Sequence, residues 1–136
     1  MRTDERVSAA WDWLGLKLVD SQEGSATVEM VPTEHMANHS GNVHGGLIST
    51  LADSAMGRAV HTIKPGVRLA TSFDLKLTFV AVGRIGETLR ATANVVHAGR
   101  RTCVTACRVE GSGGRLIATA SGTFMVKRED QRTDAD

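Results

Sequence analysis

The segment 42–53, NVHGGLISTLAD, joins one histidine and two glycines to a helical pattern that contains a single acid. The first N–H groups of an α-helix have no acceptor within the helix, and the helix dipole adds partial positive charge there. Glycines at 45 and 46 leave that end open to a substrate carbonyl. The pattern therefore predicts a hydrogen-bond donor site for a developing oxyanion, with the Gly45 N–H as donor.

Asp53 follows Gly45 by eight residues and lies on a stripe of small residues. On a helix of 3.6 residues per turn, the residues that surround it are small apart from Val60, whereas the other large apolar residues lie on the opposite side. The small neighbours are Gly46, Ser49, Thr50 and Gly57. Because a solvated helix face would more often carry Lys, Glu or Arg, we expect Asp53 to approach another backbone or a ligand.

The separation of the two groups requires a second copy of the chain. Eight residues span about 12 Å of helix, whereas a carboxylate that acts on a carbonyl must lie within about 3–4 Å of it or reach it through one water. Two antiparallel copies would place Gly45 of one chain opposite Asp53 of the other. A two-fold dimer would then contain two equal sites.

The periodicity of the chain predicts the elements that hold these groups. Apolar residues recur at helical spacing over about 44–62, and Lys64-Pro65-Gly66 ends that helix. A short amphipathic helix is expected within 5–14. The predicted strands are 14–20, 25–32, 73–79, 87–98, 101–111 and 115–127, with FDLKLTF (73–79) alternating strictly and its apolar side facing a core. This order predicts an α+β fold, one long helix against an antiparallel sheet of five or six strands.

Length and composition favour one ordinary soluble domain. The chain has 136 residues, 41% apolar residues and a net charge of +1, which gives no reason to expect nucleic acid or an anionic membrane as partner. We expect a single domain over 1–126 and a C-terminal tail over 127–136. Because residues 1–13 contain no apolar segment, we expect neither a signal peptide nor a membrane span there. The two cysteines indicate reduced thiols and a cytoplasmic setting.

The residues Asn38, His44-Gly45-Gly46 and Asp53, at this spacing before a long helix and four strands, resemble the hotdog-fold acyl-CoA thioesterases of the PaaI/THEM2-like group. The resemblance covers about residues 12–126. It implies a hotdog fold, in which the sheet wraps the long helix, and hydrolysis of a coenzyme A thioester without metal or cofactor. It also implies a homodimer as the minimal active unit and a homotetramer as the common assembly.

The resemblance also assigns roles to the matching residues. Gly45 N–H would hold the thioester oxygen beside Gly46, and Asn38 would assist at the carbonyl or at the leaving sulfur. His44 would orient that side of the site. Asp53 of the partner chain would act as general base or as nucleophile. Aspartate rather than glutamate at this position favours the PaaI-like branch over the hydroxybenzoyl-CoA thioesterases.

Two further groups complete the predicted site. The family places a serine near the start of the first strand after the helix, where it helps the acid to hold water; Ser72 matches it, with Thr71 as the alternative. Arg100 and Arg101, at a turn, could bind the phosphates of coenzyme A, as could Lys127 and Arg128. A solvated loop is the competing interpretation for these arginines.

Other combinations of side chains are weaker candidates for a reaction site. His35, His39 and His44 suggest a metal site, but a Ser-Gly-Asn break interrupts any helix and no further ligand joins them. Cys103 and Cys107 fit small strand hydrophobes better than nucleophiles. Each candidate also has an ordinary interpretation: a loop residue for His44, a solvated acid or a partner of Arg58 for Asp53, a turn residue for Asn38 and a strand serine for Ser72.

Two competing functions remain at this point. A hotdog-fold hydratase or dehydratase acting on a coenzyme A or carrier-protein thioester would use His44 as base and a substrate with an α,β double bond. A non-catalytic acyl-CoA binding module would bind ligand without turnover. Release of free thiol separates thioester hydrolysis from both.

Overall fold

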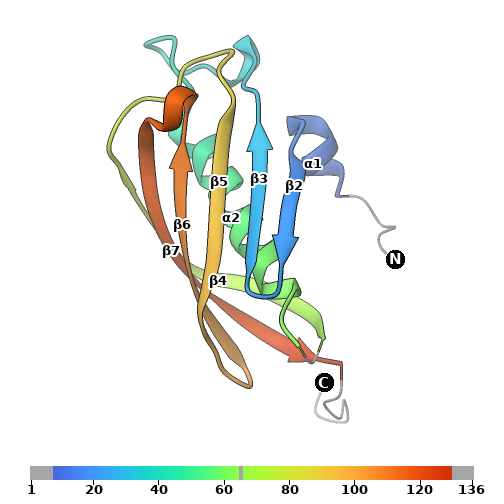
Figure 1. Cartoon of the computed structure of the whole chain (residues 1–136). Coiled ribbons are helices and arrows are strands. Elements are labelled where there is room, and N and C mark those ends of the chain that lie inside the picture. The colour runs from blue at the N-terminus through green and yellow to red at the C-terminus, as the bar shows by residue number, and fades with distance from the viewer. Residues whose placement is uncertain (1–7, 65, 130–136) are drawn as a thin grey trace.

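The computed structural model describes residues 8–64 and 66–129 as one antiparallel sheet packed on one long helix (Figure 1). The helices are α1 (Ala9–Leu14) and α2 (Gly45–His61), with 3₁₀ turns η1 (Glu34–Met36) and η2 (Ser112–Gly114). The strands are β2 (Lys17–Gln22), β3 (Ser25–Met30), β4 (Val67–Phe79), β5 (Leu89–Ala98), β6 (Thr102–Glu110) and β7 (Leu116–Arg128). The strand order is β2-β3-β5-β6-β7-β4, so the predicted α+β arrangement is confirmed with six strands.

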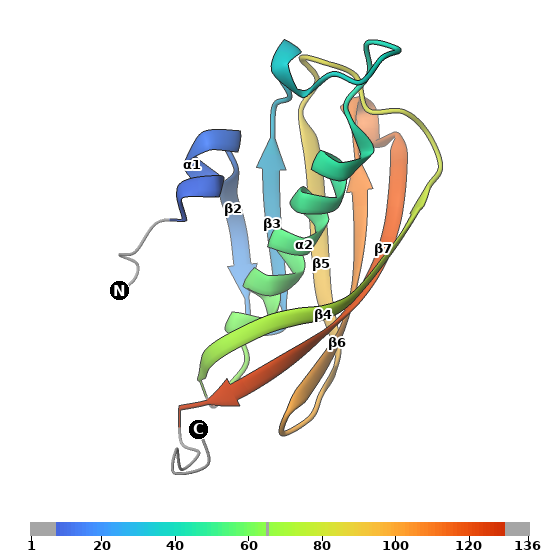
Figure 2. The ribbon, with the colours of Figure 1, turned by 180° about the vertical axis from the view of Figure 1, so that it is seen from behind.

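Helix α2 lies across the concave face of the sheet, which curls around it (Figure 2). Its large apolar side is fully covered, and the stripe that carries Asp53 is only half-buried, as the helical spacing predicts. The buried residues are Ile48, Leu51, Ala52, Ala55, Met56, Ala59 and Val60. Within residues 8–64 and 66–129, no helix is both long and apolar enough to cross a membrane.

The first elements are shorter than predicted. Helix α1 begins after Ser8, whose hydroxyl accepts from Trp11 N at 3.4 Å; the predicted residues 5–7 lie outside the described part of the chain. It ends at Gly15, which has φ of +72° and separates the helix from β2. The β2–β3 connection is also tighter than predicted, because Gly24, with φ of +85°, closes a two-residue turn.

Strand β4 differs most from the prediction. It begins at Val67 rather than at residue 73, and its pairing with β7 shifts between Ser72 and Asp74 at a bulge. The expectation that its apolar side is covered by the core is wrong for most of that side in the single chain. The exposed fractions are 58% for Phe73, 39% for Leu75 and 50% for Phe79. Strand β4 is at the edge of the sheet, and no strand among the described residues pairs with its outer side.

The last strand has the predicted length but begins and ends one residue later than predicted. Strand β7 continues to Arg128, so Lys127 and Arg128 belong to the sheet rather than to a tail; residues 130–136 lie outside the described part. The Arg128 side chain is buried and donates from Nη2 to Gly99 O at 2.8 Å. Arg128 therefore supports the β5–β6 turn that carries Arg100 and Arg101.

Candidate active site

Among the described residues, the start of α2 has one backbone donor without an acceptor. Of the first four N–H groups, Gly46 N donates to His44 Nδ1 at 3.0 Å, and Leu47 N and Ile48 N donate to His44 O at 2.9 and 3.4 Å. The Gly45 N–H has no acceptor among the described residues. At this positive helix end, the geometry singles out Gly45 rather than Gly46 as the group that can hold an oxyanion.

The His44 side chain caps the helix, and this contact defines its hydrogen bonding. Because Nδ1 accepts from Gly46 N, the neutral imidazole carries its proton on Nε2. This tautomer is assigned from the hydrogen bond. The exposed Nε2 is then a donor rather than a base. The arrangement suits the predicted orienting role of His44 and does not suit a role in which neutral His44 abstracts a proton.

The Asn38 side chain also has its acceptor atom occupied by backbone N–H groups, which leaves the amide NH₂ group as a donor. The side-chain oxygen Oδ1 accepts from Ser40 N at 2.9 Å and from Asn42 N at 3.1 Å. The backbone N–H of Asn38 donates to Asn42 O at 2.7 Å. These bonds close a tight turn before α2, in which Gly41 has φ of +80°. With the oxygen occupied, the exposed Nδ2 is left as the donor, which is the function that the resemblance predicts for Asn38.

Asp53 lies two turns further along α2, about 12 Å from Gly45 at 1.5 Å per residue. Its Oδ1 is buried, yet it has no hydrogen-bond partner among the described residues. Buried carboxylate oxygens normally accept a hydrogen bond, so the expected donor to this atom is missing from the described residues. The structure therefore does not bring Asp53 to Gly45 of its own chain, in agreement with the spacing argument.

The structure separates the two alternatives for the site hydroxyl. Ser72 pairs with Phe124, whose ring lies 3.6 Å from the point where a Gly57 Cβ would be, so Ser72 is on the helix side of the sheet. Thr71 pairs with Met125, which is 58% exposed on the opposite face. Ser72 therefore lies beside the half of α2 that follows Asp53, whereas Thr71 points away from the helix.

The predicted phosphate-binding arginines lie far from Gly45 of their own chain. Arg100 and Arg101 are exposed in the β5–β6 turn, at the opposite end of the sheet from the start of α2 (Figures 1 and 2). Within one chain they cannot act on the same end of a substrate as Gly45.

A carboxylate that no sequence pattern indicates, Glu87, anchors the loop after β4. Glu87 Oε2 accepts from Arg84 N at 2.7 Å and from Arg115 Nη2 at 2.6 Å, and Oε1 accepts from Ser112 N at 2.9 Å. Arg115 Nη1 also donates to Val82 O at 2.9 Å. Glu87, a partly buried acid, thus joins both ends of this loop to the β6–β7 turn, although nothing in the local pattern GETL indicates it.

The same loop supports the segment that precedes α2. Gly83 O accepts from Val43 N at 2.9 Å, and Asn42 forms an isolated bridge with Arg84. A Cβ at residue 83 would lie 3.3 Å from a Val43 methyl group, which explains the glycine there. Glu87 therefore acts on the predicted donor site indirectly, by holding the loop on which that site rests.

We expect Glu87→Gln to destabilise the protein in a pH-dependent way. Burial alone would raise the pKa of this carboxyl, but hydrogen bonds from Ser112 N and Arg84 N, with the Arg115 guanidinium, outweigh it and hold the pKa below its ordinary 4.5. The ionised form therefore stabilises the fold above about pH 4.5, and this contribution is lost as the pH falls through the folded-state pKa. At pH 7 the variant should lose about 1–3 kcal/mol of unfolding free energy, measured by urea titration.

The control for this prediction is Glu110→Gln. Glu110 pairs with Arg108 at 3.0 Å, but the Arg108 side chain is 58% exposed, so the change should cost less than about 1 kcal/mol. The difference between Glu87→Gln and the unchanged protein should shrink steadily below pH 4.5. An equal difference at pH 7 and pH 3 would contradict the assignment.

Thiol and metal chemistry find little support in the described residues. Cys103 and Cys107 are free and buried, and burial raises the pKa of Cys107 to about 12, so that thiol stays protonated. Burial also raises the pKa of Cys103, against the opposing charge of Arg128. Among residues 8–64 and 66–129, no group of three His, Cys, Asp or Glu side chains is placed to hold a metal ion.

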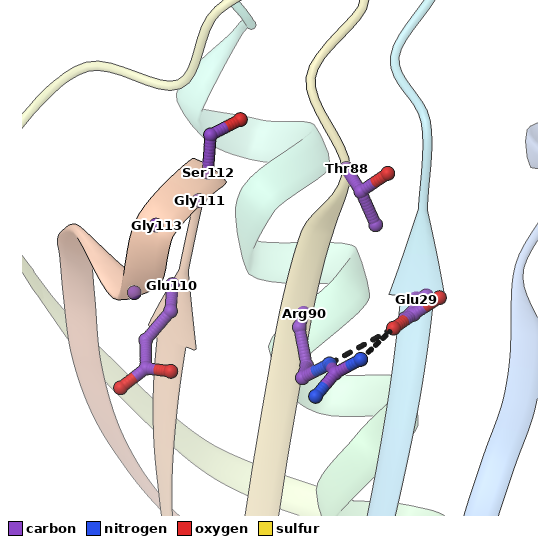
Figure 3. A pocket seen from close by; sticks show the side chains of 8 residues that line it. Glu29, Thr88, Arg90, Glu110, Gly111, Ser112 and Gly113 are labelled. Carbon is purple, nitrogen blue, oxygen red and sulfur yellow. Dashed lines mark hydrogen bonds and ion pairs between the residues drawn. The ribbon is translucent and has the colours of Figure 1, made fainter.

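A polar hollow of about 320 Å³ lies elsewhere on the sheet and does not include the predicted site (Figure 3). It is lined by Glu29, Thr88, Arg90, Glu110 and the 111–114 turn. Its cation is already engaged, because Arg90 Nη2 lies 2.6 Å from Glu29 Oε2. Since the predicted reaction site needs a partner chain, the single chain is not expected to show it as a hollow.

Comparison with known proteins agrees with this geometry. The sequence profile described as "Thioesterase superfamily" matches residues 40–118. Acyl-coenzyme A thioesterase PaaI of Escherichia coli K12 is 32% identical over 109 residues, which cover 80% of this chain and 76% of that protein. Human acyl-coenzyme A thioesterase 13 is 29% identical over 109 residues, which cover 79% and 77%.

Solved structures show the same likeness. The E. coli PaaI protein from the phenylacetic acid degradation operon superposes with a TM-score of 0.83 at 30% identity, over 88% of this chain and 85% of that one. A hypothetical thioesterase protein from Streptococcus pneumoniae, solved with coenzyme A, superposes with a TM-score of 0.77 at 25% identity, over 87% and 88%.

The curled antiparallel sheet around one long helix, with an open donor at the helix start, defines a hotdog-fold thioester hydrolase. The chain belongs to the thioesterase superfamily, and within it to the PaaI/THEM2-like group. The fold and the reaction class predicted from the sequence are thus confirmed, while the role of each residue remains a prediction.

Proposed function

We propose that this protein hydrolyses acyl-CoA thioesters to free acid and coenzyme A, at sites shared between two chains. The observation that carries the proposal is the Gly45 N–H, the one donor at the start of α2 that has no acceptor among the described residues. Relatives named as acyl-coenzyme A thioesterases and a similar protein solved with coenzyme A support the substrate class.

The exposed edge of β4 supports the dimer. This strand has 13 residues, one edge that pairs with no described strand, and four exposed apolar side chains: Leu69, Phe73, Leu75 and Phe79. A long apolar edge is a liability in a lone chain and is a ready surface for pairing with another copy. A two-fold axis through this edge would continue the sheet and set the two α2 helices antiparallel. The dimer is the minimal active unit in this proposal, and a tetramer would pair two such dimers.

In the proposed reaction, the thioester oxygen binds to Gly45 N–H, with Asn38 Nδ2 donating nearby. Asp53 of the partner chain either takes a proton from the water that attacks the carbonyl carbon or attacks that carbon itself to form a mixed anhydride, which water then cleaves. In both routes the carbonyl electron pair moves onto oxygen and returns as the C–S bond breaks. The coenzyme A thiolate leaves and is protonated. Ser72 of the chain that supplies Asp53 would help to hold the water.

The hydrogen bonding of His44 favours this reaction over the hydratase alternative. A hydratase would need a base near the donor site, but His44 Nδ1 is occupied by Gly46 N and its Nε2 carries the proton in the neutral form. His44 is better suited to donate toward the substrate. The proposed reaction also needs an available acid, and Asp53 is suited to that role because its Oδ1 has no hydrogen-bond partner among the described residues.

The test is a panel of acetyl-, hexanoyl-, phenylacetyl-, benzoyl- and crotonyl-CoA, with free thiol followed by a chromogenic thiol reagent and products followed by chromatography. We expect thiol release from several members of the panel. Hydration of crotonyl-CoA without thiol release would instead identify a hydratase. Binding by calorimetry without any turnover would identify a non-catalytic module.

A further inference from the structure

The Phe79 ring lies directly against Gly45. A Cβ built on Gly45 would lie 3.3 Å from Phe79 Cζ, 3.6 Å from Cε1 and 3.8 Å from Cε2. Phe79 is the last residue of β4, 34 positions after Gly45, so the contact arises only from the fold. The glycine therefore does more than expose an N–H group, because it also makes room for an aromatic ring beside the predicted oxyanion site.

This ring is only partly covered by the chain. Phe79 is 50% exposed, and its register partner on β7 is the small residue Ala118. The next residue, Val80, is 58% exposed, and Val82 is 50% exposed. Exposed apolar side chains therefore continue along the chain from Phe79 into the loop after β4. That loop is anchored by Val80 N to Ile117 O at 2.7 Å and by Arg115 to Val82 O at 2.9 Å.

We propose that Phe79 is a specificity-determining residue that contacts the acyl group of the substrate next to the thioester carbonyl. This inference rests on the proposed function. If the carbonyl oxygen binds Gly45 N–H at about 2.9 Å, the first acyl carbons lie within reach of a ring that touches Gly45. An apolar acyl group covers the exposed part of the ring, whereas a carboxylate-bearing acyl group would lose water there without gaining a partner.

The test measures kcat/KM for phenylacetyl-, hexanoyl-, acetyl- and succinyl-CoA with the unchanged protein, Phe79→Ala and Phe79→Leu. For the unchanged protein we expect phenylacetyl- and hexanoyl-CoA to exceed acetyl-CoA, and succinyl-CoA to be poorest. Phe79→Ala should reduce the phenylacetyl-to-acetyl ratio by about 10- to 100-fold, the usual range for an apolar contact. Phe79→Leu should retain most of the hexanoyl preference and lose most of the phenylacetyl preference.

Phe73→Ala is the matched control, since Phe73 is 58% exposed on the same strand, six residues from Phe79. If β4 forms the dimer interface, Phe73→Ala should lower activity toward all four substrates alike and leave the ratios of their kcat/KM values unchanged. Unchanged ratios in Phe79→Ala and Phe79→Leu, in a protein that hydrolyses the panel, would overturn the role of Phe79 and leave the proposed function intact. Absence of thiol release from the unchanged protein would overturn both.

Discussion

Asp53→Asn is expected to lower kcat for acyl-CoA hydrolysis by about 10²–10⁴-fold, the range that a positioned base contributes. Asparagine has nearly the same shape as aspartate but can neither take a proton from water nor attack the carbonyl carbon. The loss should fall on kcat with little change in KM, because Asp53 acts at the reacting carbon rather than on the bulk of coenzyme A. Near-normal turnover by this variant would remove the acid from the mechanism.

The same substitution should not cost stability. Asp53 Oδ1 is buried without a hydrogen-bond partner among the described residues, so the substitution breaks no hydrogen bond of that atom within the described chain. We expect the unfolding midpoint of Asp53→Asn to equal or exceed that of the unchanged protein, measured by thermal denaturation at pH 7. This separates a chemical defect from a folding defect.

Asn38→Asp is expected to reduce kcat by about 10²–10³-fold, the cost of losing one oxyanion donor. The new carboxylate keeps the oxygen that accepts from Ser40 N and Asn42 N, so the turn before α2 is retained. It replaces the Nδ2 donor by a second oxygen, which repels a developing negative charge. Far-UV circular dichroism and the unfolding midpoint should stay close to those of the unchanged protein.

Asn94→Asp is the matched control for this variant. Asn94 is exposed on β5, away from the start of α2, and the substitution changes the net charge by the same amount. We expect unchanged hydrolysis by Asn94→Asp. If Asn38→Asp also kept full activity while its fold was intact, the amide would have no part in stabilising the transition state.

Local patterns predicted α2 and its two faces well. Helical spacing identified both the buried side and the half-buried stripe with Asp53, since each depends only on residues three or four apart. The helix start was predicted from its glycines, and the structure begins α2 at Gly45. The distance from Gly45 to Asp53 followed directly from the helix rise, and it led to the expectation of a second chain.

Strand β4 shows where the sequence was insufficient. Alternation over 73–79 indicates which side chains share a face, but it does not reveal that the strand is at an edge and that its face lacks cover. The bulge between Ser72 and Asp74 depends on pairing with β7, which is remote in the sequence. The contact of Phe79 with Gly45 and the bonds of Glu87 are likewise tertiary, so no local pattern could predict them.

The most direct test of the shared site is complementation between Asp53→Asn and Asn38→Asp. A mixed dimer contains one chain of each variant. One of its sites would combine the donors of the Asp53→Asn chain with the intact Asp53 of the Asn38→Asp chain, and this site would be restored. The other site would carry both substitutions. Random pairing by co-refolding should recover about a quarter of the activity of the unchanged protein from two nearly inactive ones. If the mixture, with mixed dimers verified by native mass spectrometry, stays as inactive as its components, Asp53 does not act across the dimer seam and the proposed mechanism is wrong.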